Sequence, residues 1–147
     1  MKLTIELVPQ TAWYSNVRSN VSKSEWDVLR KACYSKAGHK CEICGGKGSK
    51  HPVECHEIWD YNDETCEQTL KGLVALCPNC HKVKHMGYAR ISGNYDIALA
   101  HLAKVNGLTE SEADAYVDEC FKKWEERSQK QWKLDITILN REANEGK

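Results

Sequence analysis

Cysteines occur twice in the sequence as pairs separated by two residues, with residues 45–76 between the pairs. The first pair is Cys41 and Cys44, and the second is Cys77 and Cys80. A turn of this length brings two sulfurs close enough to bind one ion, and two such turns supply the four thiolates of a closed zinc site. The chain has eight cysteines and no signal-peptide pattern, which favours metal binding over disulfides. We therefore predict that these four residues hold a structural zinc ion.

Histidines follow the second cysteine pair and also lie between the pairs. His81 and His85 are four residues apart, so a helix that begins after the second pair places both imidazoles on one face. Two imidazoles in this arrangement can bind a metal ion. His56 and Glu57 lie in the intervening segment, which zinc would hold against that helix. A divalent ion there can stabilise a leaving oxygen while a nearby His or Glu removes a proton from water. The same spacing also fits solvated helix residues.

Three segments together resemble a known family: Cys41–Cys44, Val53–Trp59 and Ala75–His85. The order CxxC, a short segment containing His, and LCxxCHxxxxH is similar to the HNH endonucleases, which have a ββα-metal core. The resemblance covers residues 40–88. It implies one catalytic divalent cation, Mg²⁺ or another, bound by His81, His85 and a residue of the strand pair. It also implies a histidine as general base, a helix against the DNA backbone, and a product with a 3′-hydroxyl.

The sequence departs from the family pattern at Cys55-His56-Glu57 and at Gly72. The family shows a metal ligand followed directly by the catalytic base. In one register Cys55 is the ligand and His56 the base, although a thiolate suits magnesium poorly. In the other register His56 is the ligand and Glu57 the base, and a Glu must be buried to raise its pKa from about 4.3. Gly72 stands where the family has an Asn. The two registers remain open at this point.

Basic residues near these motifs suggest contacts to DNA phosphates. Lys82 and Lys84 lie between His81 and His85, beside the expected site, and phosphates attract such groups without sequence readout. Residues 1–40 contain seven Lys or Arg and three Asp or Glu, although the whole chain has 21 of each kind. Further candidates, many of which we expect to be ordinary surface groups, are Lys47, Lys50 and Lys71 and the front-third residues Arg18, Lys23, Arg30, Lys31, Lys36 and Lys40.

The sequence patterns around these residues predict an α+β fold. In it, a small zinc-stabilised ββα-metal core is flanked by N- and C-terminal helices and short strands. Alternating apolar residues over 3–8 indicate a strand. Ser22 and Thr109, each followed three residues later by Glu, indicate two helix starts. A short helix is expected over 94–105, and a strand over 132–138 that could pair with the first. We expect one domain over 1–147, organised as a basic strand and helix (1–40), the HNH-like core (41–88), and helices with a strand (89–147).

Composition argues against a membrane-spanning protein. The hydrophobic fraction is 41%, the charged fraction is 29%, and no apolar run is long enough for a membrane span. We expect a cytoplasmic protein without a membrane partner. Cys33 and Cys120 lie on apolar helix faces, which predicts that they fill the core.

The function that these observations favour is metal-dependent hydrolysis of DNA phosphodiester bonds by an HNH-type endonuclease. One alternative is a catalytically degenerate zinc-containing module that binds nucleic acid, and another is a structural zinc domain that joins protein partners. The residues indicate no oligomeric state.

Overall fold

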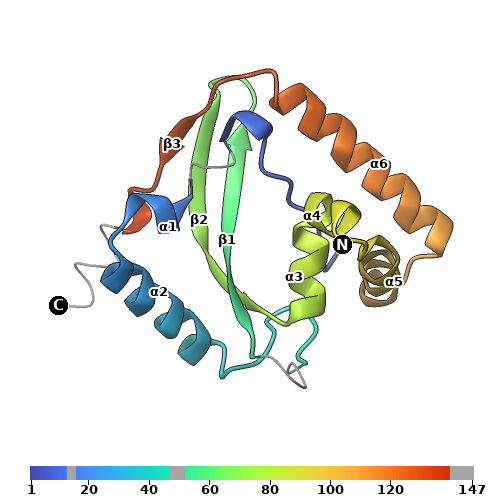
Figure 1. Ribbon diagram of the computed structural model, residues 1–147, viewed down its shortest axis with the longest axis horizontal. Helices are drawn as coiled ribbons and strands as arrows, with labels where there is room; N and C mark the ends of the chain where they lie inside the picture. The colour runs from blue at the N-terminus through green and yellow to red at the C-terminus, as the bar shows by residue number, and fades with distance from the viewer. Residues whose placement is uncertain (13–15, 47–51, 140–147) are drawn as a thin grey trace.

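The computed structural model describes residues 1–12, 16–46 and 52–139 (Figure 1). Helices and a small sheet occur together, so the expected α+β class is confirmed. Lys47 and Lys50 lie outside the described residues. In chain order the elements are η1 (Gln10–Ala12), α1 (Val17–Asn20), α2 (Lys23–Lys36), β1 (Glu54–Asn62), β2 (Glu67–Leu76), α3 (Pro78–Lys84), α4 (Met86–Ile91), α5 (Tyr95–Asn106), α6 (Glu110–Arg127) and β3 (Lys133–Asp135).

An antiparallel hairpin of β1 and β2 is the centre of the molecule, with α1 and α2 on one side and α3 to α6 on the other (Figure 1). Its register pairs Glu54 with Leu76 at the open end and Asn62 with Glu67 beside the turn. The short strand expected near the C-terminus is present as β3. It pairs in parallel with β2, not with the N-terminal segment, so β1 is left at the edge of the sheet.

The N-terminal segment is not a strand, which corrects the prediction for residues 3–8. The alternating pattern does bury Leu3 and Ile5. Their backbone groups, however, bond to side chains of distant helices: Leu3 exchanges two hydrogen bonds with the Asn106 side chain, and the Ile5 N–H donates to the Tyr116 hydroxyl. An alternating pattern therefore shows which residues are buried, but it does not show which groups form hydrogen bonds with their backbone N–H and C=O.

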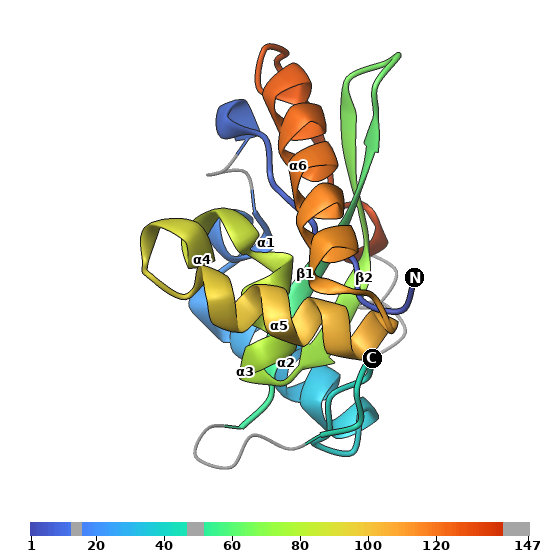
Figure 2. The same ribbon diagram turned by 90° about the vertical axis from the view of Figure 1, so that its right-hand side faces the viewer.

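Side chains cap two helices at the positions that the sequence predicts. The Ser22 hydroxyl accepts the Glu25 backbone N–H at the start of α2. Thr109 and Glu112 form a reciprocal capping box at the start of α6. The far end of α6 lies beside the hairpin turn (Figure 2), where Asp63 accepts two hydrogen bonds from the Arg127 guanidinium. None of the helices in the described part of the chain is long and apolar enough to span a membrane.

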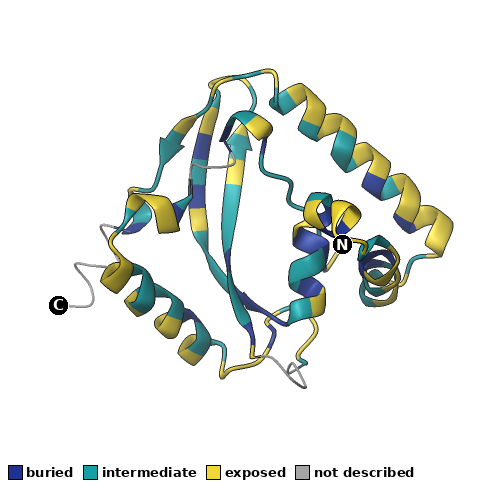
Figure 3. Ribbon diagram, viewed as in Figure 1, coloured by how far each residue is buried: buried dark blue, intermediate teal, exposed yellow. Residues whose placement is uncertain are grey.

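The main core fills the space between α3, α5, α6 and the N-terminal segment (Figure 3). Cys33 is buried as expected, and Cys120 packs against the main core while partly buried. Trp26 and Trp59 pack in a second cluster between the hairpin and α2. Residues that are fully buried in the main core include Leu3, Leu76, Val83, Met86, Leu102 and Val117.

Truncation of Leu102 tests the importance of the α5 packing. Leu102 is 0% exposed, so we expect Leu102→Ala to lower the free energy of unfolding by about 2–5 kcal/mol through lost burial and a residual cavity. Ile97 lies on the same helix but is 52% exposed, and Ile97→Ala should change it by less than about 0.5 kcal/mol. Urea unfolding of both variants measures the difference, and equal effects would contradict the described core.

Candidate functional site

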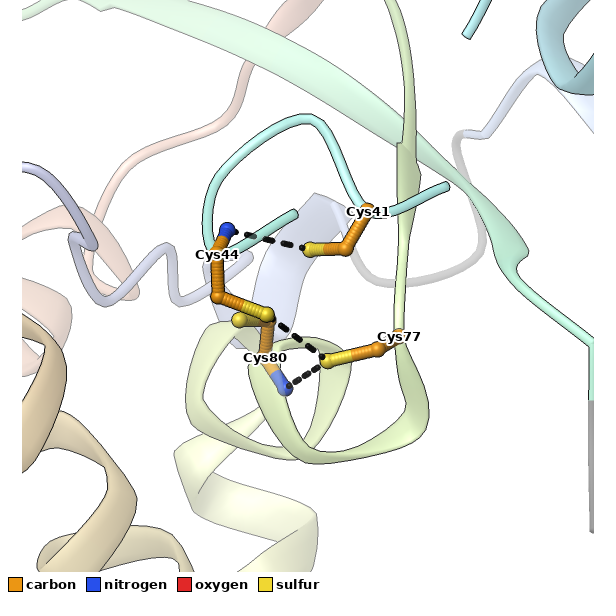
Figure 4. A group of neighbouring side chains, drawn as sticks. All are labelled: Cys41, Cys44, Cys77 and Cys80. Carbon is orange, nitrogen blue, oxygen red and sulfur yellow. Dashed lines mark hydrogen bonds between the residues drawn. The ribbon is translucent and has the colours of Figure 1, made fainter. Parts of the chain in front are cut away.

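The four paired cysteines come together where β2 passes into α3 (Figure 4). Cys41 and Cys44 belong to the loop after α2, Cys77 to the junction, and Cys80 to the first turn of α3. Their sulfurs all lie within 4.8 Å of one another, and the sulfurs of Cys44 and Cys77 are 3.6 Å apart. All four are free thiols. The structure thus assembles the set of residues that the spacing predicts.

An N–H···S hydrogen bond folds each pair into a tight turn. The Cys44 N–H donates to Cys41 Sγ at 3.5 Å, and the Cys80 N–H donates to Cys77 Sγ at 3.4 Å. Gly45 follows the first pair with a φ of 75°, a left-handed conformation that a residue without Cβ adopts at little cost. The two turns therefore present their sulfurs in matching ways.

Four sulfurs this close cannot all be anionic unless a cation lies among them. Burial raises the pKa of the Cys80 thiol, and the neighbouring Cys41 and Cys77 thiolates raise it further. Burial acts in the same direction on Cys41, but backbone N–H groups of Cys44, Cys77 and Ile43 outweigh it and lower the Cys41 pKa to about 7. A divalent cation would offset the remaining repulsion. A four-thiolate donor set suits zinc and leaves no coordination position for a substrate.

The cysteine group also joins four parts of the fold. The Glu42 N–H donates to the Ala75 carbonyl at 2.9 Å, and the Ala75 N–H donates to a Glu42 carboxylate oxygen at 2.7 Å, so the first turn is fastened to β2. Cys77 is the N-cap residue of α3. Cys80 Sγ lies 3.1 Å from Nε2 of His101 on α5. A cation in this group would therefore position α3 relative to the hairpin.

Three histidines form a second group a short distance along α3. His56 comes from β1, whereas His81 and His85 lie one turn apart on α3 and at its C-cap. One ligand atom from each lies within 4.8 Å of the other two. The ring centroids are 5.4 Å apart for His56 and His81, 5.2 Å for His56 and His85, and 4.6 Å for His81 and His85. The expected pairing of a spacer histidine with two helical histidines is thus present in the geometry.

The hydrogen bonds around His81 favour a metal-ligand arrangement. Glu54 on β1 accepts a hydrogen bond from Nδ1 of His81, which leaves the lone pair of that ring on Nε2. Nε2 of His81 faces Nε2 of His85 at 3.0 Å. A carboxylate behind an imidazole that presents its other nitrogen is the usual support of a histidine metal ligand.

The other two histidines are held neutral. Burial lowers the pKa of His56, although its contact with Glu6 at 2.5 Å opposes this. Desolvation and the nearby His81 and His56 lower the pKa of His85 to about 4. A neutral imidazole has a free lone pair, so these rings have the protonation state that a cation requires.

Cys55 and Glu57 lie on the opposite side of β1 from His56, because side chains alternate along a strand. Cys55 packs with Cys33 of α2 and is not part of the three-histidine group. Glu57 accepts the Val17 N–H at 2.5 Å, and burial raises its pKa. Since β1 is the edge strand, Glu57 still lines the same cavity as the three histidines. Of the two registers that the sequence left open, this arrangement agrees with the one in which His56 is the ligand and Glu57 the base.

The two lysines that were predicted to bind phosphate differ in burial and in their partners. Lys84 is only 4% exposed, and its ammonium group donates to Thr4 Oγ1 at 2.9 Å and to Glu6 Oε1 at 3.1 Å. It is buried and paired, so the prediction that Lys84 contacts phosphate does not fit its position. Lys82 is partly exposed, and no hydrogen bond or ion pair holds it among the described residues.

Two adjacent cavities border the histidine group. The first, of about 280 Å³, is lined by all three histidines with Glu6 and Glu57, and the second, of about 560 Å³, by Lys23, Arg30 and Tyr34 among others. Both are lined by Arg18, Trp26, Cys55 and His81. Arg18 is exposed and, within the residues that the structure describes, has no carboxylate partner. The histidine group thus opens toward a surface that carries cations.

Sequence reasoning missed Glu6, treated Glu54 only as a neighbour of His56, and named Arg18 only as one of several basic residues that could contact DNA. Glu54 could have been found, since it lies two residues before His56 and therefore on the same face of a strand. Glu6 lies 50 residues from the histidine that it contacts, and no local pattern signals such a pair.

Compared with protein-family models, curated proteins and solved structures, the chain shows no significant match.

Removal of one sulfur tests the cysteine group. We expect the purified protein to contain about one tightly held zinc per chain and Cys77→Ser to lose it, with a lower melting temperature, because three thiolates bind the ion far less well. Cys66→Ser is the matched control, since Cys66 lies in the hairpin turn outside the group. Elemental analysis and thermal unfolding give the readouts. A wild-type protein without zinc would contradict the assignment.

Titration with Ni²⁺ tests the histidine group. In zinc-replete protein, we expect His85→Ala to weaken Ni²⁺ binding by at least about tenfold, because one of three ligands is lost. His39→Asn removes an exposed imidazole in a turn with a φ of 59° and should leave the affinity unchanged. Isothermal titration calorimetry measures both, and an equal loss in the two variants would indicate non-specific binding.

Proposed function

We propose that this chain is a metal-dependent endonuclease of the HNH type that hydrolyses DNA phosphodiester bonds. One observation carries the proposal: three imidazoles from β1 and α3 converge within 4.8 Å beside cavities that basic side chains line. A structural zinc domain needs no second group of ligands. A module that only binds nucleic acid needs no buried histidine such as His56 in contact with a carboxylate.

The residues that would hold the catalytic ion are His56, His81 and His85. Imidazole donors suit zinc or nickel better than magnesium, which prefers oxygen ligands. The donor set therefore favours a borderline divalent ion over magnesium. When bound, such an ion polarises a phosphate oxygen and stabilises charge on the leaving oxygen.

Glu57 is the residue that we assign as general base. One of its oxygens is held by the Val17 N–H, and the residue lines the cavity that the histidines border. Its carboxylate takes a proton from the water whose oxygen attacks phosphorus. The bond from phosphorus to the 3′ oxygen breaks, and that oxygen takes up a proton from solvent. Burial raises the pKa of Glu57, which makes it a better proton acceptor than an exposed carboxylate.

Cations around the cavities suit a phosphate backbone. Arg18 lines both cavities and Lys23 lines the larger one. Arg30 is already paired with Asp27 at 2.9 Å, so it is less available to contact a phosphate. Lys82 lies beside His81 on α3 and is not paired with a carboxylate in the described part of the chain. Contacts of this kind bind phosphates without reading sequence, so we expect DNA affinity to fall as salt rises.

A plasmid-nicking assay with Ni²⁺, Mn²⁺ or Mg²⁺ tests the proposal. We expect Glu57→Gln to slow cleavage by about 10²–10⁴-fold with unchanged metal affinity, because Gln keeps the acceptor for the Val17 N–H but cannot take a proton. Glu64→Gln makes the same change at an exposed position in the hairpin turn and should cleave at the wild-type rate.

Three results would count against the proposal in different ways. Wild-type activity in Glu57→Gln, together with loss in His85→Ala, would rule out the assigned base and keep the metal site. Wild-type activity in both would rule out the site. DNA binding by the zinc-replete protein without cleavage in any of the metals would identify the chain as a binding module with a degenerate site.

A further inference from the structure

We propose that Glu6, from the N-terminal segment outside the hairpin and α3, is a positioning residue of the histidine site. It holds His56 in the tautomer that directs a lone pair to the cation. The inference concerns the cation site that the proposed function uses, but its test reads metal binding and ring protonation and does not require cleavage.

The path of the N-terminal segment places Glu6 beside the site. The backbone N–H groups on either side of Thr4 donate hydrogen bonds to the side chains of Asn106 and Tyr116, as described above. The Glu6 N–H donates to the Lys84 carbonyl at 3.3 Å, at the C-terminal end of α3. Glu6 is therefore attached to the helix that carries His81 and His85, while its side chain reaches the histidine on β1.

The two carboxylate oxygens of Glu6 have different partners. Oε2 lies 2.5 Å from Nε2 of His56, and Oε1 accepts a hydrogen bond from Lys84 Nζ at 3.1 Å. Lys84 is itself held by the Thr4 hydroxyl. A buried ammonium group keeps Glu6 ionised.

This arrangement decides which nitrogen of His56 is available. An ionised carboxylate only accepts hydrogen bonds, so the nitrogen that contacts Glu6 must be Nε2–H. The lone pair of the neutral ring is then on Nδ1. Glu6 accepts a ring N–H from His56, as Glu54 does from His81. Both carboxylates make the imidazoles more basic ligands. Two of the three rings thus have a carboxylate that sets their orientation.

The buried pair of Lys84 and Glu6 also explains why the site contains a lysine that cannot reach DNA. Its ammonium group neutralises the carboxylate beside the site. Without Lys84, Glu6 would be a half-buried anion beside the histidine group with no ammonium partner.

The test uses full-length, zinc-replete protein and two substitutions of Glu6. Glu6→Leu removes the acceptor, and Glu6→Gln retains an acceptor without charge. We expect Ni²⁺ affinity to fall by about 10–100-fold in Glu6→Leu and by less in Glu6→Gln. Glu64→Leu, at an exposed turn position, is the matched control and should bind as the wild type does. Zinc content and circular dichroism establish that each variant is folded.

A second readout does not depend on the added metal. Long-range ¹H–¹⁵N NMR spectra distinguish the two imidazole tautomers, and we expect His56 to be protonated at Nε2 in the wild type and to become a tautomer mixture in Glu6→Leu. Unchanged Ni²⁺ affinity in a folded Glu6→Leu, or an unchanged tautomer, would overturn the inference. So would a wild type that binds no Ni²⁺. A wild type that binds Ni²⁺ but never cleaves DNA would contradict the proposed function and leave the role of Glu6 standing.

Discussion

Repulsion among four closely spaced sulfurs, which a bound cation would relieve, is the constraint on which the rest of the structure depends. The sulfurs belong to a loop, a strand end and a helix start, which the cysteine group brings together. Cys77 is both a member of this group and the N-cap residue of α3. A residue that would ligate the cation therefore also caps the helix that carries two of the three histidines. Loss of a cation from the cysteine group would therefore disturb the histidine group, which lies only one helical turn further along α3.

In the histidine group, two of the three rings are held by carboxylates from different parts of the chain. β1 supplies both His56 and the carboxylate that orients His81, so small shifts of the hairpin would move a ligand and its support together. The N-terminal segment contributes Glu6, and α3 contributes the lysine that keeps Glu6 ionised. The site is thus a product of three segments, although its motif occupies only two.

The parts of the fold that the sequence predicts are those with local physical causes. Capping by Ser22 and Thr109 needs a partner three residues away, and the cysteine pairs need only a tight turn, so spacing reveals both. The pairing of β3 with β2 and the path of residues 3–8 depend on partners far along the chain. The same distinction applies to the site: spacing indicates His81 and His85, whereas burial of Lys84 and recruitment of Glu6 follow from tertiary packing that no window of sequence contains.

The hydrogen bonds of the N-terminal segment have a consequence for synthesis on the ribosome. Leu3 bonds to a residue 103 positions later, and Ile5 to one 111 positions later. At 5–20 residues per second, about 100 further residues take roughly 5–20 s to emerge. During that interval the backbone groups of Leu3 and Ile5 lack these partners, and the cysteine pairs and both helical histidines emerge before Asn106 and Tyr116 do. The four paired cysteines are therefore available to a metal ion before the hydrogen bonds that hold the backbone of Leu3 and Ile5 can form.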